Sequence, residues 1–329
     1  MRVYRGYSNP LSGRERRDGF GVAVAIGNFD GVHRGHRAVI GQARANAVEL
    51  GTGLGVVTFE PHPREVLQGQ DAPARLSPFR RKVELLRDLG VEHLFVLPFT
   101  RALMAVSAES FVEDILIGRL GVRAVITGDN FRFGHRRRGD VELMRRVASP
   151  HGVRVDVAGA VGDRGGVVSS TRIRAALADG RVAEAGEMLS RPYEILGLVR
   201  EGDRRGRELG FPTANTYPLH PRTAMPGTGI YAVRAALIEH DADGHALPPR
   251  WHPGAASLGT NPTFNGVESR LEVHLLDGMD YDLYGRRLRV AFIDRLRGEE
   301  RFSSIEALTA QMRIDCDRAL ALTTDSAAI

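Results

Sequence analysis

The sequence predicts an α/β fold with a mostly parallel sheet in its first half and an antiparallel β-structure in its second half. Up to about residue 190, apolar strand-like runs alternate with helix-length segments, which is the pattern of a parallel sheet covered by helices. From about residue 191, strand-like runs follow one another across Gly, Pro and Asn turns, which is typical of an antiparallel barrel or sandwich. A chain of 329 residues is also long for one core, so we expect two domains.

The first-half elements are expected in alternating order. Ser77 and Pro78 place a cap residue before a proline, which predicts a helix start, and Gly90 closes that helix. Strands are expected at 22–26, 54–59, 93–99, 123–127 and 153–157, and helices at 35–50, 108–120, 140–148, 170–179 and 182–189. Ligands of such sheets bind beyond the carboxyl ends of the strands, so the turns after Ile26, Phe59 and Thr127 are where a site is expected.

The second half is expected to be a set of short strands that ends in a helix. The strands are expected at 194–200, 229–239, 255–259, 270–276 and 288–296, with a polar loop at 240–249. Ser303 and Glu306 have the spacing of a capping box, and Ile305, Leu308 and Met312 form one apolar stripe, so the chain is expected to end in a helix.

Composition indicates an ordinary cytoplasmic globular protein. No apolar run spans a bilayer and no signal peptide is recognisable, and the single Cys316 excludes an intrachain disulfide. The net charge of +5 invites a nucleic-acid interpretation, but the positive charge is arginine scattered along the chain, with Lys82 the only lysine. We therefore expect no nucleic-acid partner and no membrane, and a weak homo-oligomer stays open.

A first constellation, GNFDGVHRGH over 27–36, follows the first long strand and opens a helix. Glycines let the backbone approach a phosphate, and a helix N-terminus offers unpaired N–H groups and a positive dipole end. His33 and His36 can both face a polyphosphate there and stabilise charge that develops on its oxygens. The structural alternative is a tight turn with two solvated histidines.

Three further segments lie where a site of this kind needs them. They are TFEPHP from residue 58, GDNFRFG from residue 128, and SSTRIR from residue 169. Phe131 and Phe133 either staple a loop or flank a planar ring. Ser and Thr at a helix start are usually caps, but Arg172 and Arg174 are also suited to hold a departing pyrophosphate.

In this order and spacing, the four segments resemble the adenylyltransferase module of bacterial bifunctional riboflavin kinase/FMN adenylyltransferases, over roughly residues 15 to 185. The resemblance implies a nucleotidyltransferase fold of the HxGH type that makes FAD from FMN and ATP, with His33 and His36 in adenylyl transfer. It implies a phosphate site made by Gly27, Asn28, Asp30, Ser170, Thr171 and Arg172. It implies a flavin site at Phe59, Asn130 and Phe131.

The second constellation, GDRRGRELGFPTAN over 202–215, is rich in glycine and arginine. Its glycines permit a loop whose N–H groups wrap phosphate oxygens, and a charged hairpin is the alternative. Thr213 and Asn215 supply hard oxygen ligands of the kind that Mg²⁺ accepts, or they anchor a turn. Glu272 lies in an alternating strand and either faces solvent or takes a proton from an attacking hydroxyl.

Together with GTGIYAV, GTNPTF and LEVHLLD, this segment resembles the riboflavin kinase module, over about residues 190 to 315. The resemblance implies a six-stranded barrel that phosphorylates riboflavin to FMN with ATP, with Glu272 as the catalytic base and Thr213 and Asn215 on Mg²⁺. The loop would cover the phosphates through Gly202, Gly206, Arg207 and Gly210. We thus expect an adenylyltransferase domain over 1–187 and a kinase domain over 188–329.

Three functional hypotheses follow. The first is a bifunctional enzyme with riboflavin, FMN and ATP as substrates and Mg²⁺ as cofactor. The second keeps the fold but retains one activity only. The third is an arginine-rich nucleic-acid binder, which salt-dependent binding without saturable flavin binding would favour. The chain shows no nucleic-acid motif or aromatic platform, so the third is ranked last.

Overall fold

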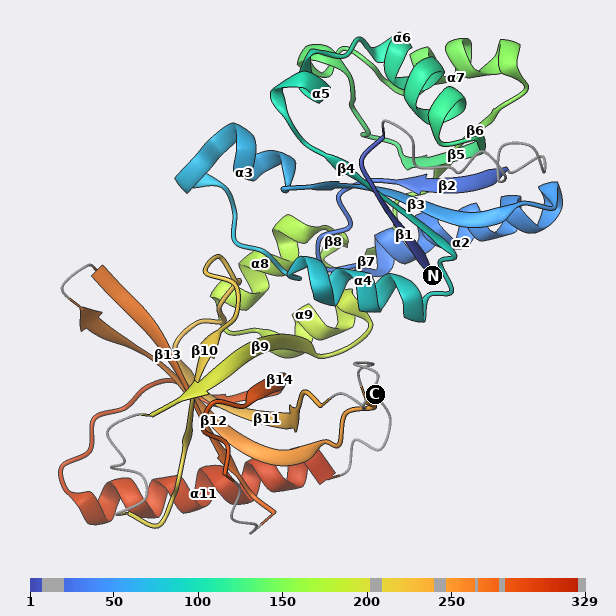
Figure 1. The fold of residues 1–329 in the computed structure, drawn as a ribbon. Helices are drawn as coiled ribbons and strands as arrows, with labels where there is room; N and C mark the ends of the chain where they lie inside the picture. Colours follow the sequence, from blue (N-terminus) through green and yellow to red (C-terminus); the bar gives the residue numbers. More distant parts are fainter. Residues whose placement is uncertain (8–20, 202–208, 240–246, 264–265, 278–281, 325–329) are drawn as a thin grey trace. The chain divides into compact units, whose positions relative to one another are not determined.

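The computed structural model describes residues 1–7, 21–201, 209–239, 247–263, 266–277 and 282–324. The chain forms two compact units, Met1–Ser170 and Thr171–Ile329 (Figure 1). Each unit has its own β-sheet, so the two-domain expectation is confirmed. The helix that begins at Ser170 starts where the first unit ends.

The first unit is built on a six-stranded parallel sheet with the order β1-β4-β3-β2-β5-β6. Its strands are β1 (Arg2–Arg5), β2 (Val22–Ile26), β3 (Gly53–Glu60), β4 (His93–Pro98), β5 (Val122–Gly128) and β6 (Arg154–Ala158). All their pairings are parallel. Because β3, β2 and β5 are neighbours, the turns that follow them lie at the same edge of the sheet.

Helices cover both faces of this sheet (Figure 1). They are α2 (Arg34–Leu50), α3 (Pro63–Gln68), α4 (Phe79–Asp88), α5 (Arg101–Ala105), α6 (Ala108–Ser110), the π-helix η2 (Phe111–Arg119) and α7 (Val141–Ala148). Short 3₁₀ turns lie at Gly69–Asp71, His135–Arg137 and Ser149–His151, and a small hairpin pairs β7 (Gly162–Asp163) with β8 (Gly166–Val167).

Two apolar cores hold the layers together, one on each face. Side chains alternate along β2, so Val22, Val24 and Ile26 pack towards α5, α6, η2 and α7. Ala23 and Ala25 face the other way, towards α2 and α4, where small side chains allow the helices to approach closely. A strand buried on both faces explains why 22–26 is apolar throughout.

The second unit is a closed six-stranded antiparallel barrel with the order β10-β13-β12-β11-β14-β9, which confirms the predicted fold class. Its strands are β9 (Tyr193–Arg200), β10 (Ala214–Pro218), β11 (Gly229–Leu237), β12 (His252–Thr263), β13 (Gly266–Leu275) and β14 (Arg287–Arg297). Five of these strands correspond to predicted ones, and β10 is additional. It lies inside the glycine-rich constellation and closes the barrel between β9 and β13.

Three helices accompany the barrel: α8 (Ser170–Ala178), α9 (Val182–Leu189) and α11 (Ile305–Thr324). The hydroxyl of Ser304 accepts from the backbone N–H of Ala307 at 3.2 Å, so Ser304 is the cap of α11. The predicted stripe is wrong at Ile305, which is 64% exposed. The buried positions are Asp315, Ala319 and Thr323, because Arg297 binds Asp315 through two nitrogen atoms.

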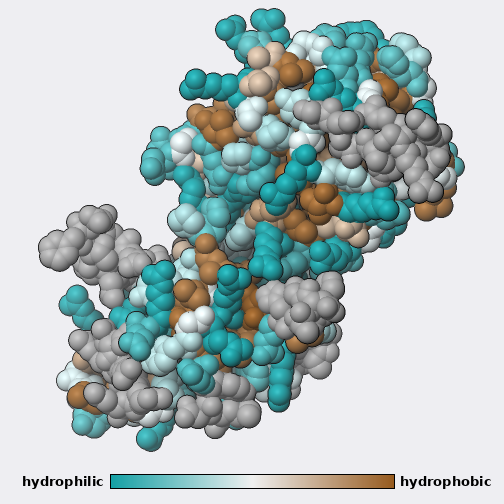
Figure 2. Space-filling model, viewed as in Figure 1, coloured by the Kyte–Doolittle hydropathy of each residue, from teal (hydrophilic) through white to brown (hydrophobic). Residues whose placement is uncertain are grey.

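On the face shown in Figure 2, the described surface is mainly hydrophilic and the hydrophobic residues form small separate patches. Among the described helices, none combines the length and the apolar character needed to cross a membrane.

Candidate functional site: two sites, one in each unit

The turn from β2 to α2 has a strained backbone. Phe29 has a φ of 50° and Val32 a φ of 45°, in a left-handed region that bulky and β-branched residues rarely adopt. Gly31, with a φ of 86°, tolerates this region because it has no Cβ. Phe29 and Val32 are both buried, so packing holds the turn in place. Strain of this kind is concentrated at ligand-binding segments.

The two predicted histidines are brought together at the start of α2. His33 caps the helix, and its Nδ1 accepts from the backbone N–H of His36 at 3.3 Å. A neutral ring that accepts through Nδ1 carries its hydrogen on Nε2. The two rings stack with their centroids 3.6 Å apart. His33 therefore presents an N–H donor at the N-terminus of α2, where the positive end of the helix dipole lies.

His36 is held in its neutral form. Burial keeps the pKa of His36 well below its usual value, and the positive charges of His33, when it is protonated, and of Lys82 add to the effect. Its Nδ1 is buried and has no hydrogen-bond partner among the described residues. A buried nitrogen without a partner is costly unless a ligand or water satisfies it, and this marks the histidine pair as a binding position.

The carboxylate of Asp30 fixes the turn from β2 to α2 through hydrogen bonds. Its carboxylate accepts from the backbone N–H of Leu76 at 3.1 Å and of Ser77 at 3.1 Å. The Ser77 hydroxyl accepts from the N–H of Gly31 at 3.0 Å, and the Ser170 hydroxyl donates to the carbonyl of Asp30 at 2.9 Å. Asp30 is buried, so its carboxylate holds the turn against the segment before α4.

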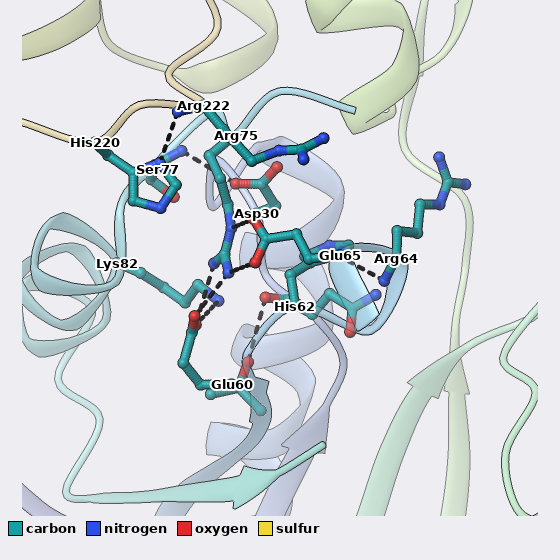
Figure 3. Close-up of polar contacts among 12 residues, drawn as sticks. Asp30, Glu60, His62, Arg64, Glu65, Arg75, Ser77, Lys82, His220 and Arg222 are labelled. Carbon is teal, nitrogen blue, oxygen red and sulfur yellow. Dashed lines mark hydrogen bonds and ion pairs between the residues drawn. The ribbon is translucent and has the colours of Figure 1, made fainter. Parts of the chain in front are cut away.

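A buried ion cluster supports that segment (Figure 3). Arg75, which is 2% exposed, binds Glu65 through Nε at 2.6 Å and Glu60 through Nη2 at 2.7 Å. The fully buried Lys82 has its Nζ 3.9 Å from Glu60. Burial lowers the pKa of Lys82, and the charges of Glu60 and Asp30 oppose that effect. The cluster joins the end of β3 to α3 and α4, and so fixes the residues that clamp Asp30.

His62 caps α3 at the edge of this cluster. It is 7% exposed, and its Nδ1 accepts from the backbone N–H of Arg64 at 3.1 Å. Burial lowers the pKa of His62 from 6.5 to about 4, with Asp30 opposing and Arg75 adding to the effect. His62 is therefore neutral in the folded protein at pH 7.

We expect the N-terminal unit to lose stability as the pH falls below about 6.5. Between the unfolded pKa of 6.5 and the folded pKa of about 4, the unfolded chain binds a proton that the folded chain does not bind. The loss attributable to His62 is about 2 kcal/mol at pH 5. His62→Asn keeps a capping side chain without the titration, so its stability is expected to fall less with pH than that of the wild type.

Urea unfolding at pH 7.5 and pH 5, followed by circular dichroism, measures this difference. Fluorescence of Trp251, the sole tryptophan, gives a separate reading for the second unit. Identical pH dependence of the wild type and His62→Asn would contradict the assignment.

The predicted flavin residues lie at the edge formed by β3 and β5. Phe59 is 8% exposed and packs edge-on against Phe99, with centroids 6.0 Å apart. Phe131 is half-buried and stacks on Phe133 at 5.6 Å, while Asn130 is exposed at the end of β5. Phe59 thus presents little area to a ligand, and Asn130 and Phe131 are the more accessible of the three.

The other predicted phosphate-site residues differ in their surroundings. Gly27 donates its backbone N–H to the carbonyl of Val57, and the carbonyl of Asn28 accepts from the Thr58 hydroxyl at 3.2 Å. Thr171 is exposed, and Arg172 binds Glu184 at 3.3 Å within the second unit.

In the barrel, the predicted kinase residues converge on one face. Asn215 pairs directly with Glu272 across β10 and β13, so their side chains lie on the same side. The Thr213 hydroxyl donates to Glu272 Oε2 at 3.2 Å. Arg270 Nε donates to Asn215 Oδ1 at 2.9 Å and forms an ion pair with Glu272 Oε1 at 2.8 Å. The three predicted residues thus form one polar cluster, with Arg270 as an addition.

Part of the glycine-rich loop lies outside the described residues, namely Gly202, Gly206 and Arg207. Gly210 is described and has a φ of 84°, which a residue with a Cβ rarely adopts. Among the described residues, no group of three or more His, Cys, Asp or Glu is arranged to hold a metal ion.

Sequence reasoning missed Arg75, Lys82 and Arg270. Arg75 and Lys82 act through contacts with Glu60, which lies 15 and 22 positions earlier in the sequence. Lys82 carried one usable signal, since it is the only lysine in an arginine-rich chain. Arg270 shares a face with Glu272 by the period of a strand, and that spacing was the available signal.

Comparison with known proteins gives a family for each half of the chain. The FAD synthetase family model matches residues 16–172, and the riboflavin kinase family model matches residues 189–323. The chain is thus a two-domain transferase of flavin nucleotide synthesis.

The same comparison gives relatives that match along nearly the whole chain. A bifunctional riboflavin kinase/FMN adenylyltransferase of Escherichia coli K12 is 38% identical over 96% of both chains, and one of Pseudomonas fluorescens is 41% identical over 99% of both. The chain belongs to the bifunctional riboflavin kinase/FMN adenylyltransferase family. It is a bifunctional enzyme with an N-terminal FAD synthetase domain and a C-terminal riboflavin kinase domain.

A solved structure also matches along the whole chain. It is described as a macrolide-efflux protein from Streptococcus pneumoniae, and it is 28% identical. The TM-score is 0.85, and the match covers 99% of this chain and 100% of that one.

Proposed function

We propose that the first site transfers the adenylyl group of ATP to FMN, at the edge where β3, β2 and β5 end. The stacked pair of His33 and His36 at the start of α2 is the observation that carries this proposal. An oxygen of the FMN phosphate attacks the α-phosphorus of ATP, a new P–O bond forms, and the bond to pyrophosphate breaks. The N–H groups of the first turn of α2 and His33 Nε2–H stabilise the charge on the phosphate oxygens.

We assign the roles around this site from the sequence motifs together with the contacts of each residue. Gly27 and Asn28 form the floor of the turn, where a phosphate approaches the backbone. Asp30 is a positioning residue, since its carboxylate is occupied by backbone N–H groups. The Ser170 hydroxyl connects the start of α8 to the turn by its hydrogen bond to Asp30. Thr171 and Arg172, the next two residues, would bind the departing pyrophosphate. Phe59, Asn130 and Phe131 would bind the flavin.

In the barrel, we assign proton removal to Glu272. Its carboxylate takes the proton of the ribityl 5′-hydroxyl, the hydroxyl oxygen attacks the γ-phosphorus of ATP, and the bond to ADP breaks. The hydrogen bond from Thr213 orients the carboxylate. Gly210, together with Gly202, Gly206 and Arg207 outside the described residues, would cover the phosphates.

The donor set of the barrel site fits Mg²⁺. Thr213, Asn215 and Glu272 present hydroxyl, amide and carboxylate oxygens to one cluster, and these are hard ligands of the type that Mg²⁺ binds. Thr213 and Asn215 would hold the ion, which when bound neutralises charge on the ATP phosphates.

Several wider assignments accompany these roles. The functional domains extend over 1–187 and 188–329, which assigns α8 to the adenylyltransferase half and divides the chain close to the ends of the family matches at 172 and 189. The substrates are riboflavin, FMN and ATP, the enzyme acts in the cytoplasm, and any self-association is weak.

Product identification by mass spectrometry tests the proposal. With riboflavin, ATP and Mg²⁺, the chain is expected to make FMN first and FAD second, with ADP and pyrophosphate as the other products. Removing Mg²⁺ with EDTA is expected to stop FMN formation. A reaction that stops at FMN in the presence of Mg²⁺ would reject the assignment of the first site, and no FMN at all would reject that of the barrel.

A further inference from the structure

Arg270 places its guanidinium on the oxygen atoms of the proposed kinase site. Its Nε is 2.8 Å from Glu272 Oε1 and 2.9 Å from Asn215 Oδ1. Thr213 contacts the other oxygen of the same carboxylate. The guanidinium nitrogen Nε therefore contacts both the proposed metal ligand and the proposed base.

The barrel fixes this arrangement. Asn215 and Glu272 face each other across β10 and β13, and Arg270 lies two positions before Glu272 on the same face. Asn215 is 5% exposed, and the Arg270 side chain is 21% exposed. The contact is thus partly sheltered from water, where charge-assisted hydrogen bonds are stronger than at an open surface.

We propose that Arg270 is an internal cation that occupies the magnesium position of the kinase site until the metal–nucleotide complex binds. The proposal rests on the metal and base assignments of the proposed function. It makes Arg270 a positioning residue that keeps Glu272 and Asn215 in place and that sets the magnesium concentration the kinase requires.

An Arg270 side chain that kept its 2.9 Å contact with Asn215 Oδ1 would lie beside an Mg²⁺ ion bound to the same oxygen atom, and the two positive charges would repel each other. Mg²⁺ binds its ligands at about 2.0–2.1 Å, so it cannot move away from the guanidinium while it stays bound to Asn215. Arginine keeps its charge at any pH that proteins tolerate, so it cannot avoid the repulsion by losing a proton. The side chain must therefore turn away when the metal binds, and this movement opposes binding.

Mn²⁺ binding in the presence of ADP, measured by electron paramagnetic resonance on the full chain, tests the proposal. Arg270→Gln is expected to bind Mn²⁺ at least about 10-fold more tightly than the wild type, a factor that corresponds to about 1.4 kcal/mol. Arg287→Gln makes the same change at an exposed strand position and is expected to match the wild type. Equal or weaker Mn²⁺ binding by Arg270→Gln overturns the proposal.

Thermal unfolding gives a second reading that does not depend on activity. Without Arg270 the oxygen atoms lack a cation, so Arg270→Gln in EDTA is expected to unfold at a lower temperature than the wild type. Addition of Mg²⁺ with ADP is expected to raise the unfolding temperature of Arg270→Gln by more than that of the wild type. Arg270→Lys keeps the charge and is expected to lie between the two. An equal rise in unfolding temperature on addition of Mg²⁺ with ADP in all three proteins overturns the proposal.

Asn215→Ala separates failure of the inference from failure of the proposed function. If it abolishes the Mn²⁺ binding but Arg270→Gln does not strengthen that binding, the metal assignment stands and the role of Arg270 is wrong. If Asn215→Ala leaves Mn²⁺ binding unchanged, the metal assignment is wrong and the role of Arg270 falls with it.

Discussion

Glu272→Gln is expected to make FAD from supplied FMN while making almost no FMN from riboflavin. Glutamine keeps one oxygen for the contact with Arg270, and its NH₂ group can donate to the Thr213 hydroxyl in place of Oε2, so the geometry of the cluster is preserved. It is not basic enough to take the proton of the attacking hydroxyl. Loss of a general base lowers the rate by about 10²- to 10⁴-fold.

Each preparation contains its own control, because the second activity lies in the other unit. Rates of FMN formation from riboflavin and of FAD formation from FMN are measured separately, with KM for ATP in each. The expected result is a large fall in kcat of the kinase and little change in the adenylyltransferase. A kinase rate close to that of the wild type would rule out Glu272 as the base.

His36→Ala is expected to have the opposite effect, so that FMN accumulates and FAD does not form. The substitution removes a neutral ring that stacks on His33 at 3.6 Å and whose Nδ1 has no partner among the described residues. Loss of one preorganised donor at a reacting centre costs about 10²- to 10³-fold in rate. We therefore expect a fall of that size in FAD formation from FMN.

His151→Ala is the matched control, since it removes an exposed histidine of the same unit whose contact is a 3.9 Å approach to Glu113. Its rates are expected to equal those of the wild type. Circular dichroism and urea unfolding check that His36→Ala is folded. FAD formation by folded His36→Ala at the wild-type rate would make His36 a residue of the turn only.

The sequence could predict the parts of the fold that are repetitive. Strands buried on both faces are apolar throughout, so 22–26 was recognisable from composition alone. β1 was not, because Arg2–Arg5 is an edge strand with an exposed, charged pattern. β10 was not, because Ala214–Pro218 contains asparagine and proline, which are depleted in strands. β10 forms a strand because its neighbours in the barrel, β9 and β13, supply its hydrogen-bond partners.

The pattern of apolar residues also could not predict the local hydrogen-bond geometry. The predicted helix over 108–120 exists, but most of it, Phe111–Arg119, is a π-helix. In α11 the buried face includes Asp315 and Thr323, since Arg297 compensates the charge of Asp315. A rule that places polar residues outside a core cannot foresee such a pair.

Motifs predicted the residues expected to meet the substrates but not the residues that hold them. The histidines and Glu272 lie in short conspicuous segments, whereas Arg75 lies in a segment without a motif. Arg75 matters because it binds two glutamates in the folded chain, a relation that spacing along the sequence does not reveal. The supporting residues follow only from tertiary contacts.

The buried position of Lys82 shields the only lysine side chain of the sequence from lysine-directed reagents. The sequence has a single ε-amino group, and the folded chain leaves none of it accessible. Acylation or reductive alkylation at that nitrogen therefore requires the unit to open, so the rate of modification is a direct gauge of how often the adenylyltransferase domain unfolds around its ion cluster.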